Sequence, residues 1–166
     1  MGGSTIFFFL LEQLSVRDIL KGIAVSSGND AAVAMAEHIK GTEESFVARM
    51  NERAAELGMV DTHFVNCNGL DADNHYSSAY DLALISKYAM QNETFREITK
   101  TKNYKLKTNL NYYDWYNKNK LLNSYKYATG GKTGYTKIAK RTLVTTASKD
   151  GVNLVAVTLN DGNDWQ

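Results

Sequence analysis

The spacing of apolar residues changes near Lys100, and this change limits the possible folds more than any other feature of the chain. Before Lys100, apolar residues recur every three or four positions, as on the buried face of a helix. After it, β-branched and aromatic residues alternate with polar ones, as in strands. Helices followed by strands predict an α+β fold with an antiparallel sheet. We expect one domain over residues 1–166, mainly helical over about 12–99 and mainly β over about 100–161.

Four helices are expected in the first part, each from apolar residues at helical spacing or from a run rich in alanine. Ser15 is placed to cap the first of them, and Ser78 with Asp81 resembles a capping box for the last. Gly58 follows the third, as is common where a helix ends. An irregular stretch over 61–77 separates the last two. The expected segments are 16–24, 30–39, 43–57 and 78 to about 92.

The clearest strand signal is a hairpin near the end of the chain. Arg141–Ser148 and Val152–Leu159 have strand composition and are separated by a turn that contains Asp150-Gly151. The apolar run Ile6–Leu11 is too short to span a membrane and lacks the preceding Lys or Arg of a signal peptide, so it indicates a strand or buried extended piece. The polar and aromatic stretch Asn109–Asn123 suggests a long loop over a cleft or a sheet edge.

Charge and composition argue against several functional classes. Lys and Arg number 19 and Asp and Glu 18, a balance that gives no reason to expect nucleic acid or an anionic membrane as partner. The three histidines lack metal-ligand spacing, so we expect no metal site and no cofactor. Cys67 is the only cysteine and cannot form an internal disulfide; a lone thiol is more often a small buried side chain than a nucleophile.

Two short motifs could support chemistry. They are Ser27-Gly28-Asn29, between the first two expected helices, and Lys132-Thr133-Gly134. Alone, the first is more typical of a helix cap and the second of a turn. Together, and in this order, they match the second and third members of a set that begins with Ser-x-x-Lys. That set occurs in penicillin-binding proteins and class A β-lactamases.

Longer stretches around these motifs make the likeness specific. They are Ser26–Ala34, Ala36–Ile39, Met50–Asn51, Glu56–Met59, Thr62–Asn66, Gly69–Asp71, His75–Ala83 and Gly131–Thr136. Through them the sequence resembles the D-alanyl-D-alanine carboxypeptidases, which are low-molecular-mass penicillin-binding proteins, from about Met1 to Asp161. The resemblance implies a β-lactamase/transpeptidase-like fold and an exported enzyme of the cell envelope. Such an enzyme trims the terminal D-Ala from peptidoglycan pentapeptide stems through an acyl-enzyme and binds β-lactam antibiotics.

The resemblance also implies roles for individual residues. Ser27 would pass a proton between the nucleophile and the leaving nitrogen, and Asn29 would orient the substrate or the catalytic lysine. Lys132 would keep the site positive, which favours a substrate that carries a carboxylate. Thr133 would bind that carboxylate, and Gly134 would let the substrate backbone approach the strand closely. The Tyr135 N–H would be an oxyanion donor.

The first motif of the set is missing, because no serine in the 166 residues is followed three positions later by lysine. In the family that the chain resembles, this motif lies several dozen residues before Ser-x-Asn, and only residues 1–26 precede Ser27 here. We therefore expect the nucleophile, its lysine base and the first strands to lie upstream of Met1. We also expect the closing C-terminal helix, the export signal and the membrane anchor to be absent from this chain.

Three expectations follow from this incompleteness. The fold lacks its N-terminal strands and its C-terminal helix, the chain alone has no carboxypeptidase activity, and an exposed sheet edge leads to self-association. One alternative is a shortened homologue that only binds muropeptide or a partner protein; an in-frame Ser-x-x-Lys in the DNA upstream would favour a fragment of an enzyme instead. A β-lactamase relative fits less well, because no motif for a deacylating Glu is evident.

Overall fold

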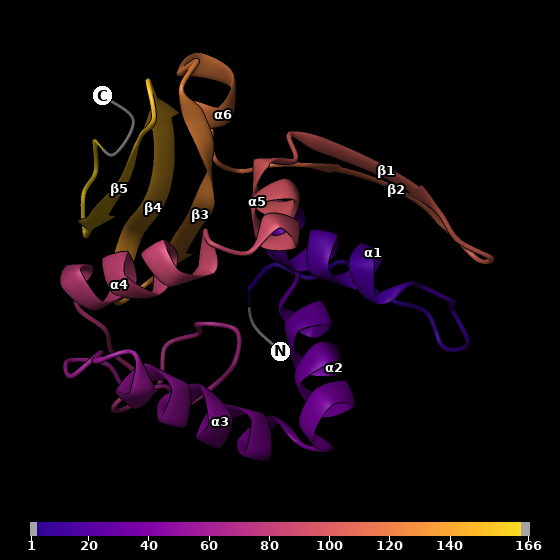
Figure 1. The fold of residues 1–166 in the computed structure, drawn as a ribbon. Coiled ribbons are helices and arrows are strands. Elements are labelled where there is room, and N and C mark those ends of the chain that lie inside the picture. Colours follow the sequence, from indigo (N-terminus) through magenta and orange to yellow (C-terminus); the bar gives the residue numbers. More distant parts are fainter. Residues whose placement is uncertain (1–2, 164–166) are drawn as a thin grey trace.

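Helices precede strands in the computed structural model, which describes residues 3–163 (Figure 1). The helical elements before Lys102 are α1 (Val16–Lys21), the π-helix η1 (Gly22–Ser26), α2 (Asn29–Lys40), α3 (Glu43–Glu56), α4 (Ala79–Ala89) and α5 (Glu93–Lys100). The elements that follow are β1 (Asn103–Lys107), β2 (Tyr112–Tyr116), α6 (Leu121–Ser124), β3 (Ala128–Thr136), β4 (Lys140–Lys149) and β5 (Val152–Leu159). All the strand pairs are antiparallel, so the predicted α+β class is confirmed.

The expected helix caps are present, with one difference. Ser15 and Asp18 bond reciprocally at the start of α1 and form a full capping box. At the start of α4, Ser78 accepts the Asp81 N–H, but the Asp81 carboxylate turns away and accepts the Asp61 N–H at 2.8 Å and the Thr62 hydroxyl at 2.7 Å. The capping box predicted there is therefore only half formed. Asp81 is fully buried and ties the irregular stretch 61–77 to α4 instead.

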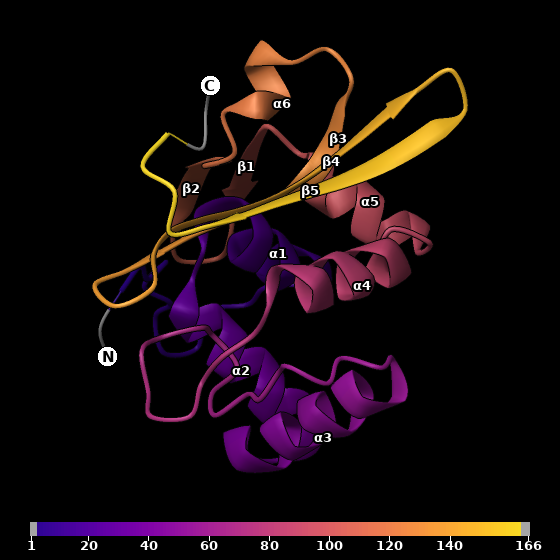
Figure 2. The same ribbon diagram turned by 90° about the vertical axis from the view of Figure 1, so that its left-hand side faces the viewer.

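The larger sheet has the strand order β3-β4-β5 (Figure 1). The predicted hairpin is confirmed: β4 and β5 pair through Ser148 and Asn153, and Asp150 and Gly151 in the turn have φ of 51° and 82°. Two consecutive residues with positive φ match the right-handed twist of a hairpin. Among the described residues β3 pairs only with β4, so one edge of β3 stays free. Figure 2 shows α4 beneath this sheet, with α2 and α3 farther from it.

The stretch 109–123 was expected to be a loop, and this expectation is wrong. It contains β2, which pairs with β1 in a two-stranded sheet, and the short helix α6. Tyr113 and Trp115 of β2 are buried and pack with Ile6, Val25 and Ala31 in the core. Their alternation with exposed neighbours is the period of a strand with one buried face. The density of polar residues around them hid this period in the sequence.

The segment Ile6–Leu11 was expected to be a strand or a buried extended piece, but it forms no strand and most of it is not buried. Ile6 is buried, but Phe9, Leu10 and Leu11 are exposed. The N–H groups of Ile6 and Phe7 bond to a side chain, the Asp30 carboxylate, and not to a neighbouring strand. No helix within residues 3–163 is long and apolar enough to cross a membrane.

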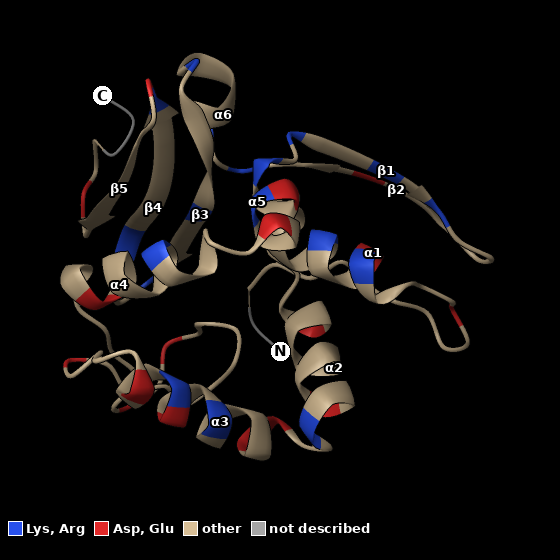
Figure 3. Cartoon of the chain, viewed as in Figure 1, with Lys and Arg blue, Asp and Glu red and all other residues tan. Residues whose placement is uncertain are grey.

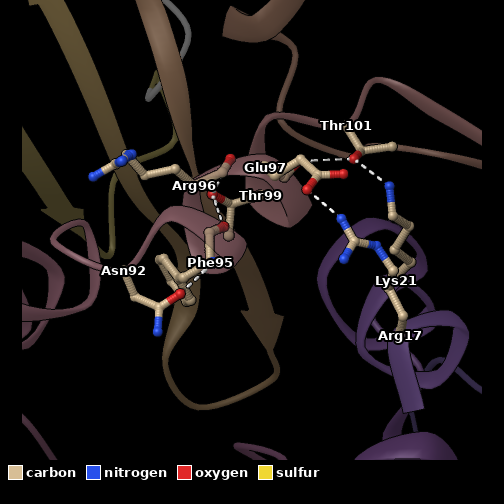
Figure 4. A network of polar contacts seen from close by, with 8 residues as sticks. All are labelled: Arg17, Lys21, Asn92, Phe95, Arg96, Glu97, Thr99 and Thr101. Carbon is tan, nitrogen blue, oxygen red and sulfur yellow. Dashed lines mark hydrogen bonds and ion pairs between the residues drawn. The ribbon is translucent and has the colours of Figure 1, made fainter.

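The helix α5 links the helical part to the sheet and was not expected from the sequence (Figure 4). Asn92 caps it by accepting the Phe95 N–H, a signal that the sequence did contain. Glu97 forms an ion pair with Arg17 of α1. Lys21, also in α1, donates to the Thr101 hydroxyl just past the end of α5. These contacts join α1 to a helix that packs against β3, the strand with the Lys-Thr-Gly motif.

Candidate active site

Ser27 lies at a sharp turn between two helices. The chain leaves η1 at Ser27, whose backbone is left-handed with φ 61° and ψ 42°, and α2 begins at Asn29. The Ser27 N–H bonds to the Ile23 carbonyl, and the Gly28 N–H bonds to the Gly22 carbonyl, which holds the turn against η1. A left-handed serine is uncommon, and such strained residues concentrate at functional sites.

The N-terminal segment braces this turn from outside. The Asn29 N–H donates to the Ser4 carbonyl at 2.8 Å. The next residue, Asp30, accepts the N–H groups of Ile6 and Phe7 at 3.0 and 2.8 Å through its carboxylate. Because these contacts involve the first residues of α2, they fix how the helix begins after the Ser27 turn.

The Lys-Thr-Gly motif lies in β3, and its position depends on neighbouring glycines. Gly131 has φ 124°, and a Cβ there would lie 2.9 Å from the Val144 carbonyl carbon and 2.8 Å from the Thr145 Cα of β4. At Gly134 a Cβ would collide with the Thr142 hydroxyl. Both glycines therefore allow β3 to approach β4 closely, and Lys132 lies between them.

Lys132 reaches across from β3 to the serine turn. Its Nζ donates to the Ser27 Oγ at 2.6 Å and to the Thr133 carbonyl at 2.7 Å. Burial and the positive charge of Lys118 lower the pKa of Lys132 to about 8. The structure thus joins two residues that are 105 positions apart, and the amine can exchange a proton near neutral pH.

The other candidate residues surround this contact. Asn29 starts α2 directly after the turn, and a Cβ at Gly3 would collide with its amide. Thr133 is half-buried beside Lys132. Tyr135 is 70% exposed and pairs with Arg141 of β4. The six candidate residues therefore lie on two elements: Ser27 and Asn29 at the turn into α2, and Lys132, Thr133, Gly134 and Tyr135 along β3.

Lys118 was missed by the sequence analysis. Its Nζ donates to the Ser4 hydroxyl at 2.8 Å, and burial lowers its pKa. The adjacent Asn119 is fully buried, and its amide donates to the Gly130 carbonyl of β3. Lys118 is therefore held between the N-terminal segment and the strand of Lys132. No signal in a single sequence separates it from the other lysines, because its contacts come from distant parts of the chain.

The described residues offer little for other chemistry. Within residues 3–163 no group of His, Cys, Asp and Glu could hold a metal ion. Burial and the nearby Glu43 raise the pKa of the Cys67 thiol to about 12. A thiol with so high a pKa stays protonated at neutral pH and is a poor nucleophile.

Ser27 lies in a Ser-x-Asn turn and is bonded to the lysine of a Lys-Thr-Gly strand at a free sheet edge. This arrangement is the one that penicillin-recognising serine peptidases have. Comparison with known proteins agrees with this class. The family model described as D-alanyl-D-alanine carboxypeptidase, peptidase S11, matches residues 1–163. The chain belongs to this family, whose members are serine hydrolases.

Curated relatives match nearly the whole chain. D-alanyl-D-alanine carboxypeptidase DacF of Bacillus subtilis (strain 168) is 46% identical over 158 residues, which cover 95% of this chain and 41% of the relative. DacC of Escherichia coli (strain K12) is 37% identical, over 98% of this chain and 40% of its own length. The chain thus spans about two fifths of the length of these relatives.

Solved structures confirm the β-lactamase/transpeptidase-like fold. The Streptomyces K15 DD-transpeptidase superposes with a TM-score of 0.89 at 35% identity, over 95% of this chain and 64% of that one. The D-alanyl-D-alanine carboxypeptidase of Mycobacterium tuberculosis H37Rv gives a TM-score of 0.88 at 34% identity, over 96% of this chain and 61% of that one.

Proposed function

We propose that this chain forms the substrate-binding and proton-relay part of a serine-type D-Ala-D-Ala carboxypeptidase that trims peptidoglycan stem peptides. The main support is the 2.6 Å contact between the Lys132 Nζ and the Ser27 Oγ. For the whole protein this function implies an extracytoplasmic location in the cell envelope, since peptidoglycan lies there. It also implies β-lactams as ligands, because these mimic the D-Ala-D-Ala terminus.

The proposed reaction needs a serine that attacks the carbonyl carbon of the penultimate D-Ala. As the new ester bond forms, the C–N bond to the terminal D-Ala breaks and the leaving nitrogen must take up a proton. Ser27 gives that proton from its hydroxyl and recovers one through Lys132, to which it is bonded. Water then hydrolyses the ester. The attacking serine and its lysine base are not among these 166 residues, which contain no Ser-x-x-Lys.

The substrate would bind along the free edge of β3. The terminal carboxylate would accept the Thr133 hydroxyl and face the charge of Lys132, while the peptide backbone would add to the strand beside Gly134. The Tyr135 N–H would donate to the carbonyl oxygen as it becomes negative. Asn29 would orient the substrate amide. Since the pKa of Lys132 is about 8, binding of the carboxylate should weaken above that pH.

Calorimetry with an N-acylated L-Lys-D-Ala-D-Ala tripeptide tests this proposal without requiring catalysis. We expect weak but measurable binding that is lost with the L-Ala-L-Ala isomer. Thr133→Val and Lys132→Gln should each weaken binding by about tenfold or more, since the first removes a hydrogen bond to the carboxylate and the second removes the positive charge that faces it. Lys137→Gln removes an equal charge from the exposed turn after β3 and should have no effect. Equal affinity for both isomers would contradict the proposal.

The same proposal predicts that the 166-residue chain alone releases no D-Ala, because groups that act as a unit lose almost all activity when one is removed. The alternative is a shortened homologue that binds muropeptide without cleaving it. An in-frame Ser-x-x-Lys in the coding DNA upstream of Met1 would favour the enzyme. Binding of the tripeptide together with no such codons upstream would favour the alternative.

A further inference from the structure

A group of apolar side chains projects into solvent at one end of the molecule. Phe9, Leu10 and Leu11 are 56%, 89% and 82% exposed, and Leu110 and Tyr112 at the β1–β2 turn are 54% and 57% exposed. We call these five residues the apolar tip. In Figure 1 the N-terminal loop before α1 and the turn of the hairpin both extend to the far right, beyond the other elements.

The two parts of the apolar tip are clamped together. The Asn109 amide donates to the Leu11 carbonyl at 3.1 Å and its oxygen accepts the Gln13 N–H at 2.8 Å. Close by, the Thr108 hydroxyl donates to the Glu12 carboxylate at 2.5 Å. Three residues of the N-terminal loop and two of the β1–β2 turn thus bond across almost a hundred positions of sequence. Hydrogen bonds therefore hold the N-terminal loop against the hairpin turn in one arrangement.

The backbone at the tip has a strained conformation at Leu11. Leu11 has a φ of 67°, a left-handed conformation that is rare for a bulky side chain. The turn is closed by the Glu12 N–H, which bonds to the Phe9 carbonyl, and by the Glu12 carboxylate, which accepts the Phe9 N–H. Such strain persists only where surrounding contacts hold it, and it occurs mostly at sites with a function.

Positive charge lies beside the apolar tip. Lys107 is exposed and stands opposite Tyr112 in the hairpin, and Figure 3 shows basic segments toward the end of β1. The acidic groups nearby already have partners. Asp114 forms an ion pair with Lys105, and Glu12 accepts hydrogen bonds from the tip itself. The tip thus presents apolar and aromatic side chains next to Lys107, which forms no ion pair among the described residues, while the hydrogen-bonded Glu12 keeps its negative charge.

We propose that the apolar tip inserts into the interface of a lipid bilayer. Leu10 and Leu11 would enter the boundary of the acyl chains, Tyr112 would lie at the level of the headgroups, and Lys107 would face anionic headgroups. This order of apolar, aromatic and basic side chains is the one that interfacial anchors have. A bilayer also accepts a convex protrusion, whereas a protein partner would need a matching groove.

Membrane binding by the apolar tip would involve a local surface and would not depend on the active site. The net charge of +1 gave no reason to expect an anionic membrane as partner, because a net charge averages over the whole surface. The tip attracts lipid mainly through buried apolar area, and the lysine adds a smaller, salt-sensitive part. A variant that loses vesicle binding should therefore keep peptide binding, and a variant that loses peptide binding should keep vesicle binding.

Sedimentation with phosphatidylcholine vesicles, with and without phosphatidylglycerol, tests the proposal. We expect the chain to bind both, and more strongly when phosphatidylglycerol is present. The double variant Leu10→Ser/Leu11→Ser should lower the partition coefficient by about tenfold or more, since each change removes the burial of a large apolar side chain. The matched control is Val60→Ser/Ile138→Ser, at positions 84% and 79% exposed on other loops, which should bind as the parent chain does.

A second variant guards against misfolding of the serine variant. Leu10→Trp keeps the tip apolar, and its fluorescence should shift to the blue and be quenched by brominated lipid. An unshifted spectrum with vesicles, or equal loss of binding in the control variant, would overturn the proposal. So would a dimer in lipid-free solution that dissociates on Leu10→Ser/Leu11→Ser while vesicle binding is absent, since the partner would then be a second copy.

Discussion

Lys132 is half-buried and donates a hydrogen bond to Ser27, and its protonation is the property on which the proposed relay depends. Burial is the largest cause of its low pKa, and the charge of Lys118 adds to it. We predict that Lys118→Met raises the pKa of Lys132 from about 8, although not to the ordinary value of 10.5, because burial remains. NMR titration of the labelled Lys132 amine measures this directly. Lys137→Met, a matched loss of charge, should leave the titration unchanged.

The same pKa predicts how stability depends on pH. The folded chain holds the Lys132 proton with a pKa of about 8, against 10.5 for an ordinary lysine, so between these values the unfolded state binds more protons. The contribution of Lys132 to the free energy of unfolding should therefore rise from pH 8 to 10.5 and be constant below pH 8. Urea unfolding of the parent chain and of Lys132→Met at several pH values measures this contribution as the difference between their free energies of unfolding. A constant difference between the two would contradict the shifted pKa.

At this scale the sequence predicted one contact of the candidate site. Ser27 and Lys132 were paired through their motifs, and the structure brings them into contact. Lys118 could not be predicted, because its bond to Ser4 spans 114 positions and depends on how the N-terminal segment folds over α2. Motifs thus identified two residues that meet in the structure, whereas Lys118, which lowers the pKa of one of them, is visible only in three dimensions.

Among the elements, β3 has little room for a side chain at Gly131. At Gly131, with φ 124°, a Cβ would meet the backbone of β4. We predict that Gly131→Ala destabilises the fold by about 2–4 kcal/mol, from both the strained φ and the separation of the strands. Gly162→Ala is the control, since a Cβ there meets no atom within 4 Å. Thermal unfolding compares the two; similar melting temperatures would show that β3 can move away from β4.

The elements with a strong local signal were predicted, and those that depend on tertiary contacts were not. The capped helices and the Asp150-Gly151 hairpin were predicted because their signals lie within a few residues. The strand β2 was missed because Tyr113 and Trp115 alternate over only five residues within a polar stretch. Phe9 was expected to lie in a strand or a buried extended piece, but no described strand pairs with its segment.

For the whole molecule, we expect the outer edge of the sheet to govern self-association. Among the described residues β5 pairs only with β4, and its Val152 and Leu154 are 59% and 64% exposed. An unprotected strand edge with apolar side chains favours pairing with another chain. We predict that the 166-residue chain self-associates at micromolar concentration and that Leu154→Lys makes it monomeric. Light scattering of both proteins tests this, and a compact monomeric parent chain would contradict it.

The central claim is that Ser27 relays a proton and does not attack the substrate. Intact-mass spectrometry of the chain after incubation with a penicillin tests it most directly. The unmodified mass is the predicted result, because the 166 residues contain no Ser-x-x-Lys to form an acyl-enzyme. A stoichiometric adduct that maps to Ser27 would contradict the account, since the serine bonded to Lys132 would then itself be the nucleophile.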